Sequence, residues 1–216
     1  MSSRKAAARV GGAATVAAGA FAIKGNHDAA IEGDHSDMNE LARRGIDYAR
    51  GKLGPAHRRF LAEMPLSVEE GPALFVHASA RAPDNWEYIT GPQQAERSLR
   101  STKARITIVG HVHAPHLWRL TSSGTATGHI PASGVDIPLA RSQTWLAVMG
   151  AVGQPRDGNC AAAFGLLDTV RSTLTFERVS YDHFATCRKV QASVRMTRST
   201  TRAGIWSSTH GSQRID

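Results

Sequence analysis

Three short polar segments constrain the fold of this chain more than any other feature of its sequence. Each contains histidine and directly follows an apolar run: residues 25–28 (Gly-Asn-His-Asp), His77 after Leu-Phe-Val, and residues 110–113 (Gly-His-Val-His). Short apolar runs bounded by turn signals predict buried strands, and binding or catalytic groups gather where such strands end. The sequence therefore predicts one polar site that is built from several strand ends.

The spacing of the last segment indicates the chemistry of that site. In an extended strand, residues two apart point to the same side, so His111 and His113 are expected to face the site while Val112 faces away. Imidazole nitrogens with an amide oxygen suit borderline divalent cations such as manganese, iron or zinc. A lone histidine at a strand end is more often a hydrogen-bonded polar residue, but three such segments together favour a metal site.

The pattern of apolar residues and turn signals predicts the surrounding elements. Asp37, with Glu40 three residues on, is expected to cap a helix that ends at Gly54, and Pro55 to open a second helix that ends at Pro65. Further helices are predicted at 92–101 and 182–190, and loops at 25–33, 122–128 and 155–159. Strands are predicted at 21–23, 66–69, 73–77, 105–109, 116–121, 144–149, 162–168 and 172–179.

Length and composition limit the domain organisation and the compartment. With 216 residues, 41% of them hydrophobic, the chain suits one domain, predicted at residues 20–190 between a basic, alanine-rich segment 1–19 and a basic Ser/Thr/Arg-rich tail 191–216. No apolar run is long enough for a membrane-spanning helix, and two cysteines are too few for a disulfide framework. We therefore predict a cytoplasmic protein. The alternative, a signal peptide, would place its cleavage inside the strand expected at 21–23.

The net charge of +8 is distributed in a way that argues against nucleic-acid binding. The excess lies in residues 1–10 and 188–216, whereas the stretch between them carries equal numbers of basic and acidic residues. A nucleic-acid-binding face is expected to place Lys and Arg along a structured element with interleaved aromatic residues. We therefore do not expect nucleic acid to be a partner.

The order of the three segments resembles that of the calcineurin-like metallophosphoesterases. The likeness extends to Trp86-Glu87-Tyr88 and to residues 152–158 (Val-Gly-Gln-Pro-Arg-Asp-Gly), which are similar to bacterial members of the compact phosphodiesterase or protein-phosphatase-like type. It covers about residues 20–190. The resemblance implies an α+β fold, a β-sandwich flanked by helices in α/β/β/α layers.

The resemblance also implies roles for individual residues. Asn26, His77 and His111 would bind one of two divalent ions, and His113 the other. His27 would face the phosphoryl group and protonate the leaving oxygen or stabilise developing charge, with Asp28 orienting its ring. The substrate would be a phosphomonoester or phosphodiester, either a small molecule or a phosphoprotein.

The sequence departs from the family at its start. Family members carry an Asp-x-His motif and a Gly-Asp motif before Gly-Asn-His-Asp, but no Asp-x-His occurs in this chain, and its Gly33-Asp34 comes later. We therefore expect the N-terminal strands to be missing, a sheet edge to be unpaired, and metal binding to be weak. The alternative function is a catalytically inactive fragment or pseudoenzyme that acts as a binding module.

Overall fold

The computed structural model describes residues 20–196, so the predicted segments 1–19 and 197–216 lie outside the described residues. The chain divides into two units at Tyr181 and Asp182. The first unit contains all the strands of the described residues, and the second contains α6 (His183–Met196), which Asp182 caps by accepting the Ala185 N–H at 2.9 Å. Within the described range, no helix has the length and hydropathy needed to span a membrane.

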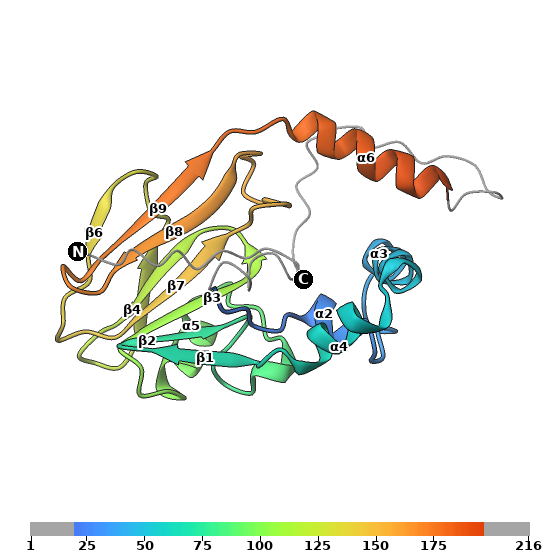
Figure 1. Ribbon diagram of the computed structural model, residues 1–216. Coiled ribbons are helices and arrows are strands. Elements are labelled where there is room, and N and C mark those ends of the chain that lie inside the picture. Colours follow the sequence, from blue (N-terminus) through green and yellow to red (C-terminus); the bar gives the residue numbers. More distant parts are fainter. Residues whose placement is uncertain (1–19, 197–216) are drawn as a thin grey trace. The chain divides into compact units, whose positions relative to one another are not determined.

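A six-stranded sheet forms the centre of the first unit (Figure 1). Strands β2, β3 and β7 run parallel, whereas β1, β4 and β5 pair antiparallel with their neighbours. The parallel strands read as continuous apolar runs because both of their faces are covered. In spatial order the strands are β1 (Ser67–Glu70), β2 (Ala73–Val76), β3 (Ile106–His113), β7 (Trp145–Gly150), β4 (His116–Leu120) and β5 (Ala126–His129).

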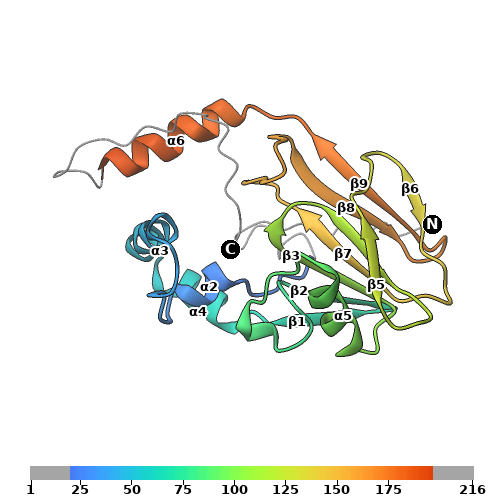
Figure 2. The same cartoon turned by 180° about the vertical axis from the view of Figure 1, so that it is seen from behind.

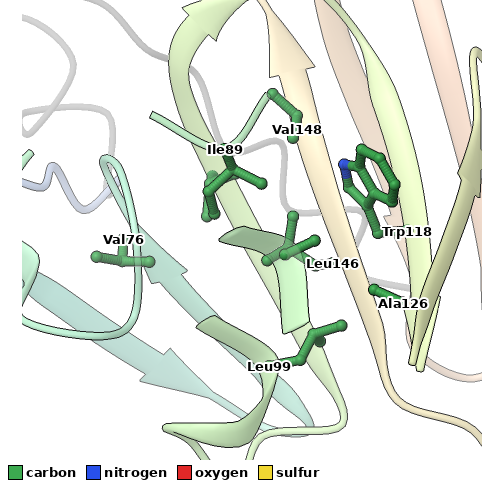
Figure 3. Packing of buried hydrophobic residues seen from close by; sticks show 9 residues of the cluster. Val76, Ile89, Leu99, Trp118, Ala126, Leu146 and Val148 are labelled. Carbon is green, nitrogen blue, oxygen red and sulfur yellow. The ribbon is translucent and has the colours of Figure 1, made fainter. Parts of the chain in front are cut away.

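One face of the large sheet packs against α5 (Pro92–Arg100), as Figure 2 shows. The helix buries Ala95 and Leu99 on one side and exposes its charged residues on the other, which is the pattern of an amphipathic helix. Figure 3 shows the packing on this face. The buried cluster consists of Val76, Ile89, Ala95, Leu99, Val109, Trp118, Ala126, Leu146 and Val148.

The other face packs on a three-stranded antiparallel sheet, so the two sheets form a sandwich. Its strands are β6 (Asp136–Pro138), β9 (Thr173–Val179) and β8 (Ala162–Asp168), in that order. The core between the sheets contains Ala73, Ile106, Leu117, Leu139, Trp145, Ala147, Leu174 and Phe176. The predicted α+β sandwich is confirmed. The outer strands of the large sheet are β1 and β5, and the four strands between them pair on both sides.

Three helices gather at one end of the large sheet (Figure 1): α2 (Asn26–Ala30), α3 (Glu40–Lys52) and α4 (Pro55–Glu63). They share a small apolar cluster in which Ala30, Ile31 and Ile46 are buried. The cluster is separate from the two cores of the sandwich, so α2 is held mainly by its helical neighbours.

Several predictions in this region are wrong in detail. Residues 21–23 form no strand; Phe21 instead packs edge-on against Phe75, with ring centroids 5.1 Å apart. The loop predicted at 25–33 contains α2. The cap of α3 is Asn39, whose Oδ1 accepts the Ala42 N–H at 2.9 Å, and not Asp37. Strand β5 overlaps the loop predicted at 122–128, because pairing with β4 gives a strand to a segment without apolar periodicity. The pattern also missed β6 and a 3₁₀ turn at Pro83–Asn85.

Candidate functional site

Three donor atoms from separate parts of the chain meet at the ends of β2 and β3. His77 directly follows β2, His111 lies in β3, and Asn26 is the first residue of α2. The Nε2 atom of His77 lies 3.1 Å from Oδ1 of Asn26 and 3.1 Å from Nδ1 of His111. Both imidazoles are 4% exposed, so the donors converge in a buried place.

These separations suit a divalent cation in chemistry and in scale. Metal–nitrogen bonds of about 2.1 Å put neighbouring ligands of an octahedral ion roughly 3 Å apart. The same separations suit hydrogen bonds when no ion is bound. Within residues 20–196, no group of three or more His, Cys, Asp or Glu side chains is placed to hold a metal. The third donor here is the amide oxygen of Asn26.

Gly25 allows the His77 ring to lie close to the start of α2. A Cβ atom at position 25 would lie 3.0 Å from Cε1 and 3.1 Å from Nδ1 of His77. The Gly25 N–H donates to Oδ2 of Asp28 at 2.8 Å, and this bond fixes the entry into the helix. Asp28 therefore has a local structural contact, while its role in orienting the ring of His27 stays a prediction.

Two arginines fix the other end of α2, and with it the position of Asn26. The Arg50 guanidinium donates to the carbonyls of Ala30, Ile31 and Gly33 at 2.7, 2.8 and 2.6 Å. These carbonyls lie at the end of a five-residue helix or just beyond it and have no intrahelical donors. Arg58 in turn donates to the Arg50 carbonyl at 2.6 Å, so α3 and α4 together hold α2 in place.

The backbone of β3 is irregular where it carries its two histidines. His111 and His113 have φ angles of 63° and 65°, and the pairing of β3 with β7 shifts register between Val109 and His113. Non-glycine residues in this left-handed region cost about 1–3 kcal/mol each and cluster at functional sites. Both histidines line one cavity, while Val112 packs against the core. As expected, the two histidines face one side and Val112 faces the other. The strained backbone produces this arrangement, and not the alternation of a regular strand.

A backbone contact sets the tautomer of His113. Its Nδ1 lies 2.8 Å from the carbonyl oxygen of Gln154. Because a carbonyl oxygen only accepts, Nδ1 carries the proton and the lone pair lies on Nε2. Arg156 N–H donates back to the His113 carbonyl at 3.1 Å, so residues 154–156 are tied to this histidine on both sides. An acceptor of this kind commonly lies behind a histidine that binds a metal ion.

The site cavity is a hollow of about 340 Å³ beside these donors. Tyr88 forms part of its wall, and its ring stacks on His111 with centroids 3.9 Å apart at 29°. The wall contains histidine, arginine and amide groups but no Asp or Glu, so it favours an anion. Its lining residues are Asn26, His27, Tyr88, His111, His113, Ala151, Val152, Gly153, Gln154 and Arg156.

A second, apolar cavity of about 280 Å³ lies between the two sheets and shares His27 with the first. This inter-sheet cavity is lined largely by aromatic and aliphatic side chains of both sheets and of α4, such as Phe60, Phe75 and Phe164. His77 and Asp28 also reach it. The predicted site residues thus lie at the boundary between a polar and an apolar hollow.

The structure brings together the predicted site residues around the two cavities, although their roles stay predictions; they are Asn26, His27, Asp28, His77, His111 and His113. Sequence reasoning gave no role to Tyr88, Gln154 or Arg156, which lie in the site cavity; the only signal was their place in segments similar to the metallophosphoesterases. Asp34 lies in neither cavity wall. Its carboxylate accepts from the N–H and hydroxyl of Ser36, and these bonds lower the pKa of Asp34.

Comparisons with known proteins place this geometry in context. The sequence matches no family model. It is 27% identical over 168 residues to the uncharacterized protein MJ0912 of Methanocaldococcus jannaschii, a match that covers 75% of this chain. The chain spans 65% of the length of that curated relative.

Two solved structures share the fold. The hypothetical protein PH1004 from Pyrococcus horikoshii is 18% identical, with a TM-score of 0.64 over 84% of this chain and 71% of the other. The metallophosphoesterase from Sphaerobacter thermophilus is 31% identical, with a TM-score of 0.67 over 81% of this chain and 70% of the other. With this level of identity over most of both chains, and with the histidine site at the strand ends, the chain belongs to the metallophosphoesterase family.

Proposed function

We propose that this chain hydrolyses a phosphomonoester or phosphodiester with the help of divalent metal ions. The observation that carries the proposal is the convergence of Asn26 Oδ1, His77 Nε2 and His111 Nδ1, with 3.1 Å separations, beside a cavity without carboxylates. Membership of the metallophosphoesterase family supports the reaction class. A small phosphoester or a phosphoprotein in the cytoplasm is the substrate and setting that we propose.

The donor set indicates which residues would hold the ions. Asn26, His77 and His111 would hold one, and His113, whose lone pair lies on Nε2, would contribute to a second. Imidazole and amide ligands suit manganese, iron or zinc. When bound, such ions supply Lewis acidity toward the phosphoryl oxygens and a nucleophile at neutral pH. Because no carboxylate lies in the cavity wall, we expect weak metal affinity.

His27 is the residue that we propose to act on the phosphoryl group. It follows Asn26 in α2 and lines the site cavity, so it borders the space that the substrate would occupy. A protonated imidazole there would donate to the leaving oxygen or to the charge that develops on the phosphoryl group. Asp28 would hold α2 at the angle that presents this ring, through its bond to Gly25.

A second candidate function is an anion-binding module without catalysis. The specific observation in its favour is the same lack of carboxylates, because a pair of divalent ions placed close together needs negative ligands. Such a module would bind phosphate in the site cavity but would not turn a phosphoester over. The two candidates therefore differ in turnover and not in binding.

Hydrolysis of 4-nitrophenyl phosphate and bis(4-nitrophenyl) phosphate, with and without added Mn²⁺, tests the proposal. We expect Mn²⁺-dependent turnover that His27→Ala abolishes. The matched control is His57→Ala, since His57 is exposed on α4 and outside both cavity walls. Equal rates for the two variants would contradict the role of His27. Phosphate binding by a folded wild-type chain without turnover would establish the binding module instead.

A further inference from the structure

We propose that Arg156 is the residue that selects a phosphomonoester over a phosphodiester in the site cavity. The inference rests on the proposed hydrolytic function and narrows its substrate class. Four properties of Arg156 carry it: its place in the cavity wall, a fixed backbone, a guanidinium not engaged by a carboxylate, and a cavity wall without Asp or Glu.

The backbone of Arg156 is fixed relative to the histidines. Its N–H donates to the His113 carbonyl at 3.1 Å, and the carbonyl of Gln154, two residues earlier, accepts from Nδ1 of His113 at 2.8 Å. Pro155 between them restricts the chain further. The side chain therefore starts from a defined point beside the donor site, which lowers the entropy lost when it binds a ligand.

The guanidinium of Arg156 is available for a ligand. Among the described residues it forms no ion pair, and its one side-chain hydrogen bond runs to Oε1 of Gln154 at 3.4 Å, which is long for such a bond. The adjacent carboxylate, Asp157, pairs with Arg178 instead. Arg178 is also tied to the carbonyls of Asn159 and Ala161. Asp157 thus pairs with Arg178 and does not neutralise the positive charge of Arg156.

The charge of the cavity favours the more highly charged ester. Its wall combines Arg156 with His27, His111 and His113 and contains no Asp or Glu. A phosphomonoester carries close to two negative charges near neutral pH and three terminal oxygens, whereas a diester carries one charge and two such oxygens. The planar fork of arginine binds two phosphate oxygens at once, and charge-assisted bonds of this kind are about twice as strong as neutral ones. Loss of Arg156 should therefore weaken monoester binding more than diester binding.

The test compares the same two aryl esters in wild type, Arg156→Ala and Arg156→Lys, with Mn²⁺ present. We expect Arg156→Ala to lower kcat/KM for the monoester roughly 10- to 100-fold, mainly through KM, and that for the diester less than about threefold. Arg156→Lys keeps the charge without the fork and should fall between. Arg119→Ala is the control, because Arg119 is exposed on β4 and outside both cavity walls.

Equilibrium titration with inorganic phosphate separates this inference from the proposed function. Weaker phosphate binding by Arg156→Ala, with Arg119→Ala unchanged, supports the anion-binding role whether or not the chain turns over an ester. If the wild type binds phosphate through Arg156 but hydrolyses neither ester, the proposed hydrolysis fails, and with it the selection between esters. Equal losses for the monoester and diester, or unchanged phosphate binding, overturn the inference while hydrolysis stands.

Discussion

Two groups of histidines occupy strand ends in the large sheet, and they differ in what their ring nitrogens face. At the ends of β2 and β3, the rings of His77 and His111 cross at 62° with centroids 4.9 Å apart, and one nitrogen of each points at the other. At the start of β4, His116 lies flat on Trp118, with centroids 4.1 Å apart at 26°.

The comparison shows that burial alone does not distinguish a proposed metal ligand from a packed side chain. His77 and His111 are buried, and the ring of His116 is buried enough for its pKa to be lowered, chiefly by desolvation and further by repulsion from His129. What differs is the convergence of donor atoms. The first group gathers an amide oxygen and has a left-handed backbone at His111, whereas His116 pairs regularly with Val148 of β7.

The largest effect should come from removing the central donor of the first group. His77→Ala deletes the nitrogen that lies within 3.1 Å of both Asn26 and His111. Because changes even to groups behind metal ligands cost 10- to 100-fold in metal affinity, we expect a loss of at least about 100-fold in Mn²⁺-dependent turnover. Calorimetric titration with Mn²⁺ should show a parallel loss of affinity.

His116→Ala is the counterpart within the second group. It removes a ring that packs on Trp118 outside the site cavity. Turnover measured with excess Mn²⁺ should stay within about threefold of wild type. If the two substitutions reduce turnover equally, the distinction between a ligating and a packed histidine is wrong.

A smaller effect should follow from moving His77 without removing it. Gly25→Ala places a methyl group 3.0 Å from Cε1 and 3.1 Å from Nδ1 of that ring, which forces the ring or α2 to shift. A displacement of about 1 Å in an active site lowers the reaction rate up to 100-fold. A shift of a few tenths of an ångström should therefore lower turnover roughly tenfold.

Gly45→Ala is the matched control for this change. Gly45 lies in α3, and a Cβ there meets nothing within 4 Å. We expect unchanged turnover and a gain of about 0.5–1 kcal/mol in the free energy of unfolding, because alanine favours the helix. Chemical denaturation of both variants checks that the loss at Gly25 is local. Equal activity in the two variants would mean that His77 has room to move.

The sequence predicted which residues lie in the site better than it predicted the backbone that positions them. Asn26, His77 and His111 could be named because each directly follows an apolar run or lies in a recognisable motif. The left-handed backbone at His111 and His113 could not be predicted, since it accompanies a register shift against β7, a strand much later in the chain. Periodicity could not separate His77 from His116 either, because both flank apolar residues and differ only in their partners.

The same holds for the fold: elements with a clear local sequence pattern were predicted, and elements that depend on long-range pairing were missed. Strand β8 was predicted at its observed bounds, Ala162–Asp168, because its apolar run is bounded by turn residues. Strand β5 was missed because Ala-Thr-Gly-His has little β propensity of its own. The short α2 was missed because its N-terminal bond, from Gly25 to Asp28, resembles an ordinary turn in sequence.

The stacked Tyr88 ring should contribute less than either glycine or histidine changes at the site. It packs 3.9 Å from the His111 ring and is 46% exposed. Tyr88→Ala removes this support, and aromatic pairs contribute about 0.5–1.5 kcal/mol beyond their buried area, so we expect a two- to tenfold loss in kcat/KM. Tyr88→Phe retains the stack and should retain activity. A loss in the phenylalanine variant would show instead that the hydroxyl contacts the substrate.

The smallest expected effect is a pH dependence of protein stability that arises from His116. Because the folded state lowers the pKa of His116 below its usual value of about 6.5, the unfolded chain takes up a proton at higher pH than the folded chain does. The free energy of unfolding should therefore decrease as the pH falls below about 6.5, and this contribution should be constant above it. His116→Phe retains the packing on Trp118 and removes the titrating ring. Thermal melts from pH 7.5 to 5 should show a smaller fall in Tm for this variant than for wild type. His129→Gln removes only the repulsion and should give an intermediate fall in Tm. Identical slopes of Tm against pH in all three proteins would show that the His116 ring is solvated in the folded state.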